Sequence, residues 1–136
     1  MAGSWRVLCF SVKQADWSIP DKPYDLRERL LNFAVVCVRL VQYLHTQGRI
    51  AAKLSEQVLT ASNSAGANYE EADDGSSARD KLSKRKIVLR ELKEVNFRLR
   101  VLRKAGFLTE IHDPVIQESL ELKLILAKII RNTPSA

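Results

Sequence analysis

Apolar residues between residues 25 and 131 recur at helical spacing, in four separate segments. The first segment runs from Asp25 to about His45, and its apolar positions are spaced 4, 3, 4, 3 and 4 residues apart. These positions are Leu26, Leu30, Phe33, Cys37, Leu40 and Leu44. Such spacing keeps side chains on one face of a helix, and strands do not produce it. The pattern predicts a helix from Asp25 to about His45.

The second segment, from about Arg49 to Asp74, repeats this spacing with small side chains. Its inward positions are predicted to be Ala51, Leu54, Val58, Ala61, Ala65, Asn68 and Ala72. Small residues let helix backbones approach closely, so this helix is expected to be central. Gly66 lies inside it and costs roughly 1 kcal/mol relative to alanine. A close backbone contact would explain that glycine.

The third segment begins with a capping signal. Ser77 is followed by Asp80 three residues later, which is typical of a helix N-terminus. The apolar stripe of this helix is Val88, Leu92, Val95, Leu99 and Leu102. The helix is predicted to end near residues 105–106, where Gly106 provides a stop signal.

The fourth segment is apolar around most of its circumference. Asp113 and Pro114 predict an N-cap followed by proline at the first helical position, and the helix continues to about Arg131. Its large apolar residues are Leu120, Leu122, Leu124, Ile125, Leu126, Ile129 and Ile130. A helix that is apolar on more than one face needs more than one partner. One face is expected to enter the protein core and the other to contact another subunit.

Short connections between these helices require consecutive helices to be antiparallel. The sequence therefore predicts an all-α fold, an up-down-up-down antiparallel four-helix bundle over residues 23–132. Residues 133–136 form a tail and residues 1–22 an N-terminal extension. Three interpretations of the apolar run at residues 5–12 stay open: a short strand, an arm on a neighbouring subunit, or disorder.

Composition narrows the class of protein. The chain has 136 residues, which fits one domain, and a net charge of +6, which favours an anionic partner. No apolar run approaches the length that spans a bilayer, and no leader pattern opens the chain. Cys9 and Cys37 form no metal-binding or disulfide pattern. A cytoplasmic protein without a membrane contact is expected.

Catalytic signatures are absent from the sequence. His45 and His112 lie near helix ends, where the helix dipole accounts for them, and no phosphate-binding loop or nucleophile motif occurs. No Glu-x-x-His pair suggests a metal-binding bundle. Neither catalysis nor a cofactor is expected. A carboxylate metal site made by Glu71, Glu91 and Glu94 is the sharper alternative, although no histidine ligand supports it.

A polar cluster closes the second helix. Asn68 falls on the predicted seam and is followed by Tyr69 and Glu71. The favoured interpretation is a buried amide that fixes helix register, with Glu91 or Glu94 of the third helix as its partner. A role in binding a partner molecule is the other interpretation of this motif.

The third helix is strongly basic. Residues 79–104 contain eleven Lys and Arg but only three acidic residues, a surplus of eight. Basic stripes along helices neutralise phosphates and release counterions, so an RNA or DNA backbone is the expected ligand. No aromatic ladder indicates base stacking. The alternative is a solvated face. The candidate contacts are Arg79, Lys81, Arg85, Lys86, Arg90, Lys93, Arg100, Arg103 and Lys104.

Two helices together resemble a known family. The second helix carries Ser-x-Ser-x-x-x-Asn-Tyr-x-Glu-Ala, and this motif resembles the signature of bacterial four-helix-bundle proteins encoded by intervening sequences in large-subunit ribosomal RNA genes. Its residues are Ser62, Ser64, Asn68, Tyr69, Glu71 and Ala72. The third helix matches at Ser77, Asp80, Lys84, Ile87, Arg90, Glu91, Glu94, Leu99 and Leu102. Phe97 stands in a region where the family often carries tryptophan.

The resemblance implies a function. This superfamily is similar to the accessory variability determinants of diversity-generating retroelements, which are basic homopentameric barrels of four-helix bundles. They bind nucleic acid and a reverse transcriptase and have no catalytic activity. The resemblance therefore implies a non-enzymatic RNA-binding accessory protein, either a reverse-transcriptase partner or a ribosomal intervening-sequence protein. The rival interpretation is a purely structural oligomeric scaffold that binds an acidic protein.

Overall fold

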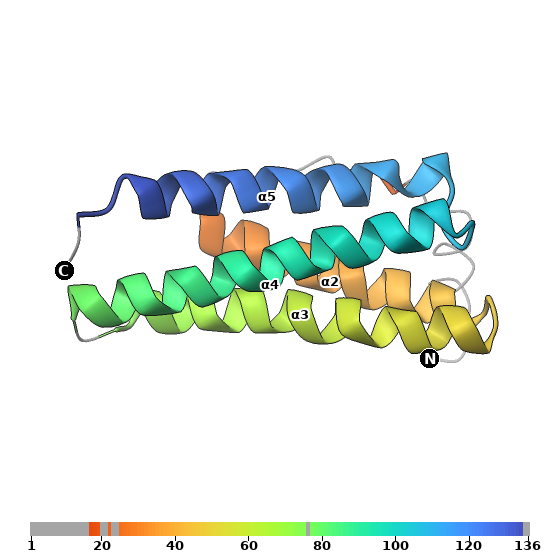
Figure 1. Cartoon of the computed structure of the whole chain (residues 1–136), viewed down its shortest axis with the longest axis horizontal. Coiled ribbons are helices and arrows are strands. Elements are labelled where there is room, and N and C mark those ends of the chain that lie inside the picture. The colour runs from red at the N-terminus through yellow and green to blue at the C-terminus, as the bar shows by residue number, and fades with distance from the viewer. Residues whose placement is uncertain (1–16, 20–21, 23–24, 76, 135–136) are drawn as a thin grey trace, which may run out of the picture.

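The chain folds into four long helices that lie side by side (Figure 1). A computed structural model describes residues 17–19, 22, 25–75 and 77–134, and no strand occurs in that part of the chain. The elements are α2 (Leu26–His45), α3 (Arg49–Asp73), α4 (Ala78–Lys104), the short 3-10 helix η1 (Glu110–His112) and α5 (Asp113–Arg131). The predicted all-α four-helix bundle is confirmed. The run at residues 5–12 lies outside the described residues.

The first helix matches its prediction closely. The Asp25 side chain accepts a hydrogen bond of 3.0 Å from the Arg27 amide and caps the N-terminus of α2. Five of the six predicted seam residues are buried, and only Leu26 is half-buried. The heptad spacing therefore identified the inward face of α2 correctly.

The inward face of α3 differs from the prediction. Leu54 and Asn68 are only half-buried, whereas Ser55, Ser62 and Tyr69 are buried. The two serine hydroxyls donate to carbonyls of their own helix, Ser55 to Ala52 at 2.7 Å and Ser62 to Leu59 at 3.2 Å. Because these hydroxyls are satisfied locally, the serines pack in the core much as alanines do.

Gly66 of α3 does not need the close backbone contact that was predicted for it. A Cβ atom added there would lie 3.9 Å from the Leu30 carbonyl oxygen of α2, which is an ordinary van der Waals contact. An alanine would fit at this position. The nearest neighbour is the α2 backbone, and it leaves room for a methyl group.

The ends of α4 follow the predicted signals. The Ser77 hydroxyl accepts a hydrogen bond of 3.1 Å from the Asp80 amide and caps the N-terminus. Gly106 has a φ of +89°, a left-handed conformation that suits glycine and stops the helix after Ala105. All five residues of the predicted apolar stripe are buried.

The start of α5 needs a correction. Asp113 was predicted as the N-cap, but it is the first residue of the helix and the turn η1 precedes it. His112 stabilises this turn, because its Nδ1 atom accepts a hydrogen bond of 3.0 Å from the Thr109 amide. The Asp113 carboxylate is then available to accept from Arg103 of α4 at 2.9 Å.

A buried ion pair joins α2 to α5. The Arg29 guanidinium donates to both carboxylate oxygens of Glu118, at 2.7 and 2.9 Å, and the Glu118 side chain is only 1% exposed. Arg29 also donates to Glu121 at 2.9 Å, and Lys22 contacts the same carboxylate at 2.9 Å. These contacts fix the two helices relative to each other.

Residues upstream of position 23 also contact the bundle. Trp17 is buried, and its ring centre lies 5.4 Å from that of His112. The ring centre of Tyr43 lies 5.1 Å from that of the same imidazole. Trp17 and Lys22 therefore pack against the bundle, although both precede the predicted boundary of the domain.

The exposed large apolar side chains include a row on α2 and one residue of α5. On α5, Leu122 and Leu126 are buried while Leu124 is 57% exposed, as expected for a helix with two apolar faces. On α2, an exposed apolar row faces away from the core and consists of Leu31, Val35 and Val38. Within the part of the chain described, no helix is long and apolar enough to cross a membrane.

Candidate nucleic-acid interface

One face of α4 projects away from the core and carries almost only cations. Its exposed residues are spaced 4, 3, 4, 3 and 4 apart, the same rhythm as the buried stripe on the opposite side. We call this face the outer stripe of α4, and it consists of Lys86, Arg90, Lys93, Phe97, Arg100 and Lys104. Arg79, also exposed, extends it toward the start of the helix. Five of these six stripe residues are cations, so positively charged groups face solvent along most of the helix.

Most cations of α4 lack an acidic partner. Three of them pair with carboxylates: Lys84 with Glu71 at 3.0 Å, Arg98 with Glu94 at 3.7 Å and Arg103 with Asp113 at 2.9 Å. Among the residues that the structure describes, no carboxylate lies within 4.0 Å of the other eight cations of residues 79–104. Eight of the eleven cations of this segment therefore have no ion-pair partner in the described part of the chain.

The nine predicted contact residues do not share one environment. Six are exposed: Arg79, Lys86, Arg90, Lys93, Arg100 and Lys104. Lys81, Arg85 and Arg103 are half-buried. Among the described residues, the Nε atom of Arg85 is buried without a hydrogen-bond partner, and the hydrogen bond from Arg103 to Asp113 raises the pKa of the Arg103 guanidinium. Arg85 and Arg103 are thus less available to a ligand than the exposed six.

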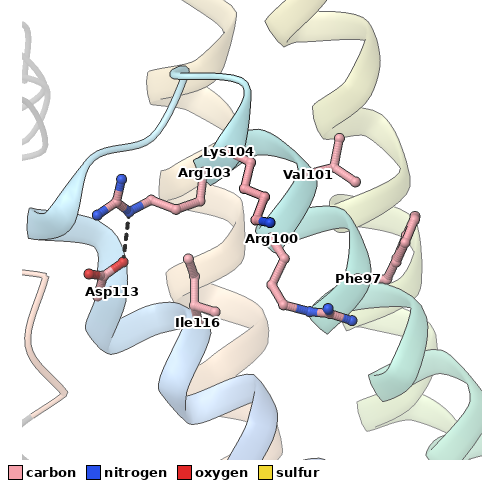
Figure 2. Close-up of a pocket in the computed structure, with 7 residues that line it drawn as sticks. All are labelled: Phe97, Arg100, Val101, Arg103, Lys104, Asp113 and Ile116. Atoms are coloured by element: carbon pink, nitrogen blue, oxygen red, sulfur yellow. Dashed lines mark hydrogen bonds and ion pairs between the residues drawn. The ribbon is translucent and has the colours of Figure 1, made fainter.

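A groove lies beside the last turns of the outer stripe (Figure 2). It has a volume of about 340 Å³, and its apolar wall comes from Phe97 and Val101 of α4 and Ile116 of α5. Figure 2 shows Arg103 reaching across to Asp113 at one end, while Arg100 and Lys104 project between that pair and Phe97. The groove therefore combines an apolar surface with three cations.

Arg100 is held in place at this groove. Its Nε atom donates a hydrogen bond of 3.0 Å to the Asn96 side chain, and Asn96 donates to Ser119 of α5 at 2.9 Å. The guanidinium carbon lies 5.8 Å from the centre of the Phe97 ring. Within the described residues, no hydrogen bond or ion pair occupies the terminal nitrogens of Arg100. Sequence analysis missed Phe97 as a site residue, although the spacing of the outer stripe includes it.

The polar motif of α3, which contains Asn68 and Tyr69, makes other contacts than those predicted. The Asn68 side chain donates to the Ser64 carbonyl at 2.9 Å and to the Ser64 hydroxyl at 3.1 Å, both within its own helix. Its expected partners, Glu91 and Glu94 of α4, are not used, because Asn68 is half-buried and does not sit on the inward face. Tyr69 takes the inward position, and burial raises its pKa.

The acidic residues of the motif do not form a metal site. Glu71 accepts a hydrogen bond from Lys84 at 3.0 Å, and burial together with the nearby Glu94 raises the pKa of Glu91. Over residues 17–19, 22, 25–75 and 77–134, no three histidine, cysteine or carboxylate side chains gather in a way that could hold a metal ion. Glu71, Glu91 and Glu94 therefore do not converge on one point.

The comparisons with known proteins include a solved structure that is similar to the chain. No family model matches the chain, and no curated protein matches it. The chain is similar to the crystal structure of a protein of unknown function from the S23 ribosomal protein family of Bacteroides thetaiotaomicron VPI-5482. The two share 28% sequence identity and a TM-score of 0.72, over 79% of this chain and 100% of that chain.

Proposed function

We propose that this chain is a non-enzymatic RNA-binding protein, and that the outer stripe of α4 holds the phosphate backbone. One observation carries the proposal. Six exposed cations, Arg79 and the five of the outer stripe, lie on one helix face without a carboxylate partner in the described part of the chain. Such a surface attracts polyanions because each neutralised phosphate releases condensed counterions.

The geometry of the outer stripe suits a backbone ligand. Between Lys86 and Lys104 the helix rises about 27 Å, at 1.5 Å per residue. Cations recur along this length every three to seven residues, so several successive phosphates can be neutralised at once. Contacts of this kind hold any sequence, since they carry no information about the bases.

Two further observations favour RNA over other polyanions as the ligand. The structural relative belongs to a family named after ribosomal proteins. The motif that contains Asn68 and Tyr69 resembles the signature of ribosomal intervening-sequence proteins, a superfamily that is similar to retroelement accessory proteins. We infer that the chain acts in the cytoplasm as such a protein or as the accessory partner of a reverse transcriptase.

The same proposal includes an assembly. Ion pairs at the ends of neighbouring helices, Arg27 with Glu70 and Arg103 with Asp113, support the predicted up-down-up-down order. The exposed apolar row of α2 and the exposed Leu124 of α5 supply surfaces on which copies of the chain would associate, as a homopentameric ring.

A structural scaffold is the second candidate function. The exposed side chains of Leu31 and Leu124 favour it, because apolar surface on two helices indicates protein contacts that do not involve the basic face. In that case the cations of α4 would bind an acidic protein instead of RNA.

Salt dependence separates these two functions. We predict that the wild type binds a single-stranded RNA with a steep dependence of log affinity on log salt concentration. Replacing Lys86, Arg90, Lys93 and Lys104 by glutamine removes up to four phosphate contacts, each contributing about 0.7 to the slope. Titrations by fluorescence anisotropy at several salt concentrations should therefore show a slope smaller by about 2 to 3.

A matched variant controls for net charge. Arg39, Lys53, Lys128 and Arg131 are exposed cations on the other three helices, and their replacement by glutamine removes the same charge. This control should leave the slope close to that of the wild type. Equal slopes for the two variants, or no RNA binding by the wild type at low salt, would contradict the proposed function.

A further inference from the structure

One residue of the outer stripe is not a cation. Phe97 lies between Lys93 and Arg100 in the 4–3 spacing, and its side chain is 53% exposed. A phenyl ring that faces water keeps apolar surface exposed, whereas the apolar side chains of the buried stripe of α4 are removed from water. The ring therefore forms an apolar contact surface within a row of phosphate-binding groups.

The surroundings of Phe97 define the ligand that fits there. Val101 and Ile116 continue the apolar surface, and the groove that they line has a volume of about 340 Å³. Arg100 and Lys104 stand at its edge, and Arg100 is oriented by Asn96. A ligand with a flat apolar part and an attached anion would satisfy both features of the groove.

We propose that the groove binds one unpaired nucleobase of a single-stranded nucleic acid, an inference that rests on the proposed function. The base lies against the Phe97 ring, and the adjacent phosphate is bound by Arg100 and Lys104. Aromatic rings and guanidinium planes are the surfaces on which unstacked bases are bound in single-strand recognition. A duplex cannot supply such a base, because its bases are stacked on one another. The protein thus distinguishes single strands from duplexes.

A second copy of the chain suits the groove less well. Two copies meeting through this face would bring Arg100 and Lys104 of each close to the same cations of the other. The carboxylate of the groove, Asp113, is already bound to Arg103 at 2.9 Å and does not offset that repulsion. Charge complementarity therefore favours an anionic occupant.

An abasic oligonucleotide separates base binding from phosphate binding. We expect the wild type to bind short oligo(dA) about tenfold more tightly than an oligomer of the same length built from abasic residues, since stacking on one aromatic ring is of that order. The two probes carry the same phosphates. Phe97→Ala and Phe97→Leu should weaken only oligo(dA) and bring the ratio close to one, whereas Phe97→Trp should preserve it.

Ile50→Ala is the matched control, because Ile50 is 66% exposed on α3, outside this groove. It should leave the ratio unchanged. Equal affinity of the wild type for both probes would overturn base binding while the phosphate function stands. No binding of either probe at low salt would overturn both. A fall in oligomeric state of Phe97→Ala with an unchanged ratio would show a subunit contact instead and also overturn the inference.

Discussion

His112 is a buried histidine whose surroundings favour its neutral form. Its Nδ1 atom accepts a hydrogen bond from the Thr109 amide, so the proton of the neutral ring lies on Nε2. That Nε2 atom is buried with no hydrogen-bond partner in the described part of the chain, and the rings of Trp17 and Tyr43 lie beside the imidazole. Burial lowers the pKa of His112 from its ordinary value of 6.5.

This lowered pKa predicts a loss of stability in mild acid. The unfolded chain takes up a proton at His112 near pH 6.5, whereas the folded chain resists it. The contribution of His112 to the free energy of unfolding is therefore complete above that pH and is lost as the pH falls below it. Urea unfolding between about pH 7 and pH 5 should show this decline.

The variant His112→Phe tests whether His112 causes this loss of stability in mild acid. It keeps an aromatic ring beside Trp17 and Tyr43 but has no titrating group. Its free energy of unfolding should vary less over the same range of pH. A decline as steep as that of the wild type would show that another group is responsible.

At the level of single residues, part of the candidate site could be predicted from the sequence. The excess charge of α4 is a property of composition, so it could be counted directly. Which cations remain available depends on tertiary partners, and the carboxylate that binds Arg103 comes from Asp113 in another helix. Asn68 was placed on the inward face in error, because alanines and serines on α3 give little contrast between its faces.

At the scale of the helices, a buried ion pair between Arg29 and Glu118 holds α2 against α5. Glu118 is 1% exposed and Arg29 13% exposed, and Lys22 lies 3.8 Å from the same Glu118 carboxylate. Two hydrogen bonds of 2.7 and 2.9 Å satisfy the carboxylate. Removing Arg29 takes away both short hydrogen bonds of the buried Glu118 carboxylate and leaves it the weaker contact with the more exposed Lys22. Such a loss strongly destabilises a buried charge.

We predict that Arg29→Ala lowers the free energy of unfolding by about 3 to 5 kcal/mol. The double variant Arg29→Met with Glu118→Met removes both charges and should recover most of this loss, because apolar side chains of similar size can replace a buried ion pair. Chemical denaturation of the three proteins measures both effects. A double variant less stable than Arg29→Ala would contradict this account of the junction.

Helix boundaries were the most predictable elements. Asp25, Ser77 and Gly106 act through hydrogen bonds and backbone conformation within a few residues, so local sequence is sufficient. The turn η1 was not predicted, because its stabilising contact is made by a histidine ring and not by a common capping residue. Packing of Trp17 on His112 joins residues far apart in the sequence and left no periodic signal.

The molecule as a whole has an uneven distribution of charge. Residues 79–104 carry a surplus of eight positive charges, whereas the rest of the chain has eleven basic and thirteen acidic residues. The field of the protein is therefore dominated by α4. Such an asymmetry orients an approaching polyanion toward one face and accelerates its association at low salt.

Lysine reactivity measured with and without RNA tests the central claim most directly. An amine-reactive reagent followed by mass spectrometry reports each lysine in one sample. Bound phosphates should protect Lys86, Lys93 and Lys104 of the outer stripe, while the exposed Lys53 and Lys128 on other helices should react as before. Protection confined to Lys53 or Lys128, or equal protection of all five, would contradict an RNA interface on α4.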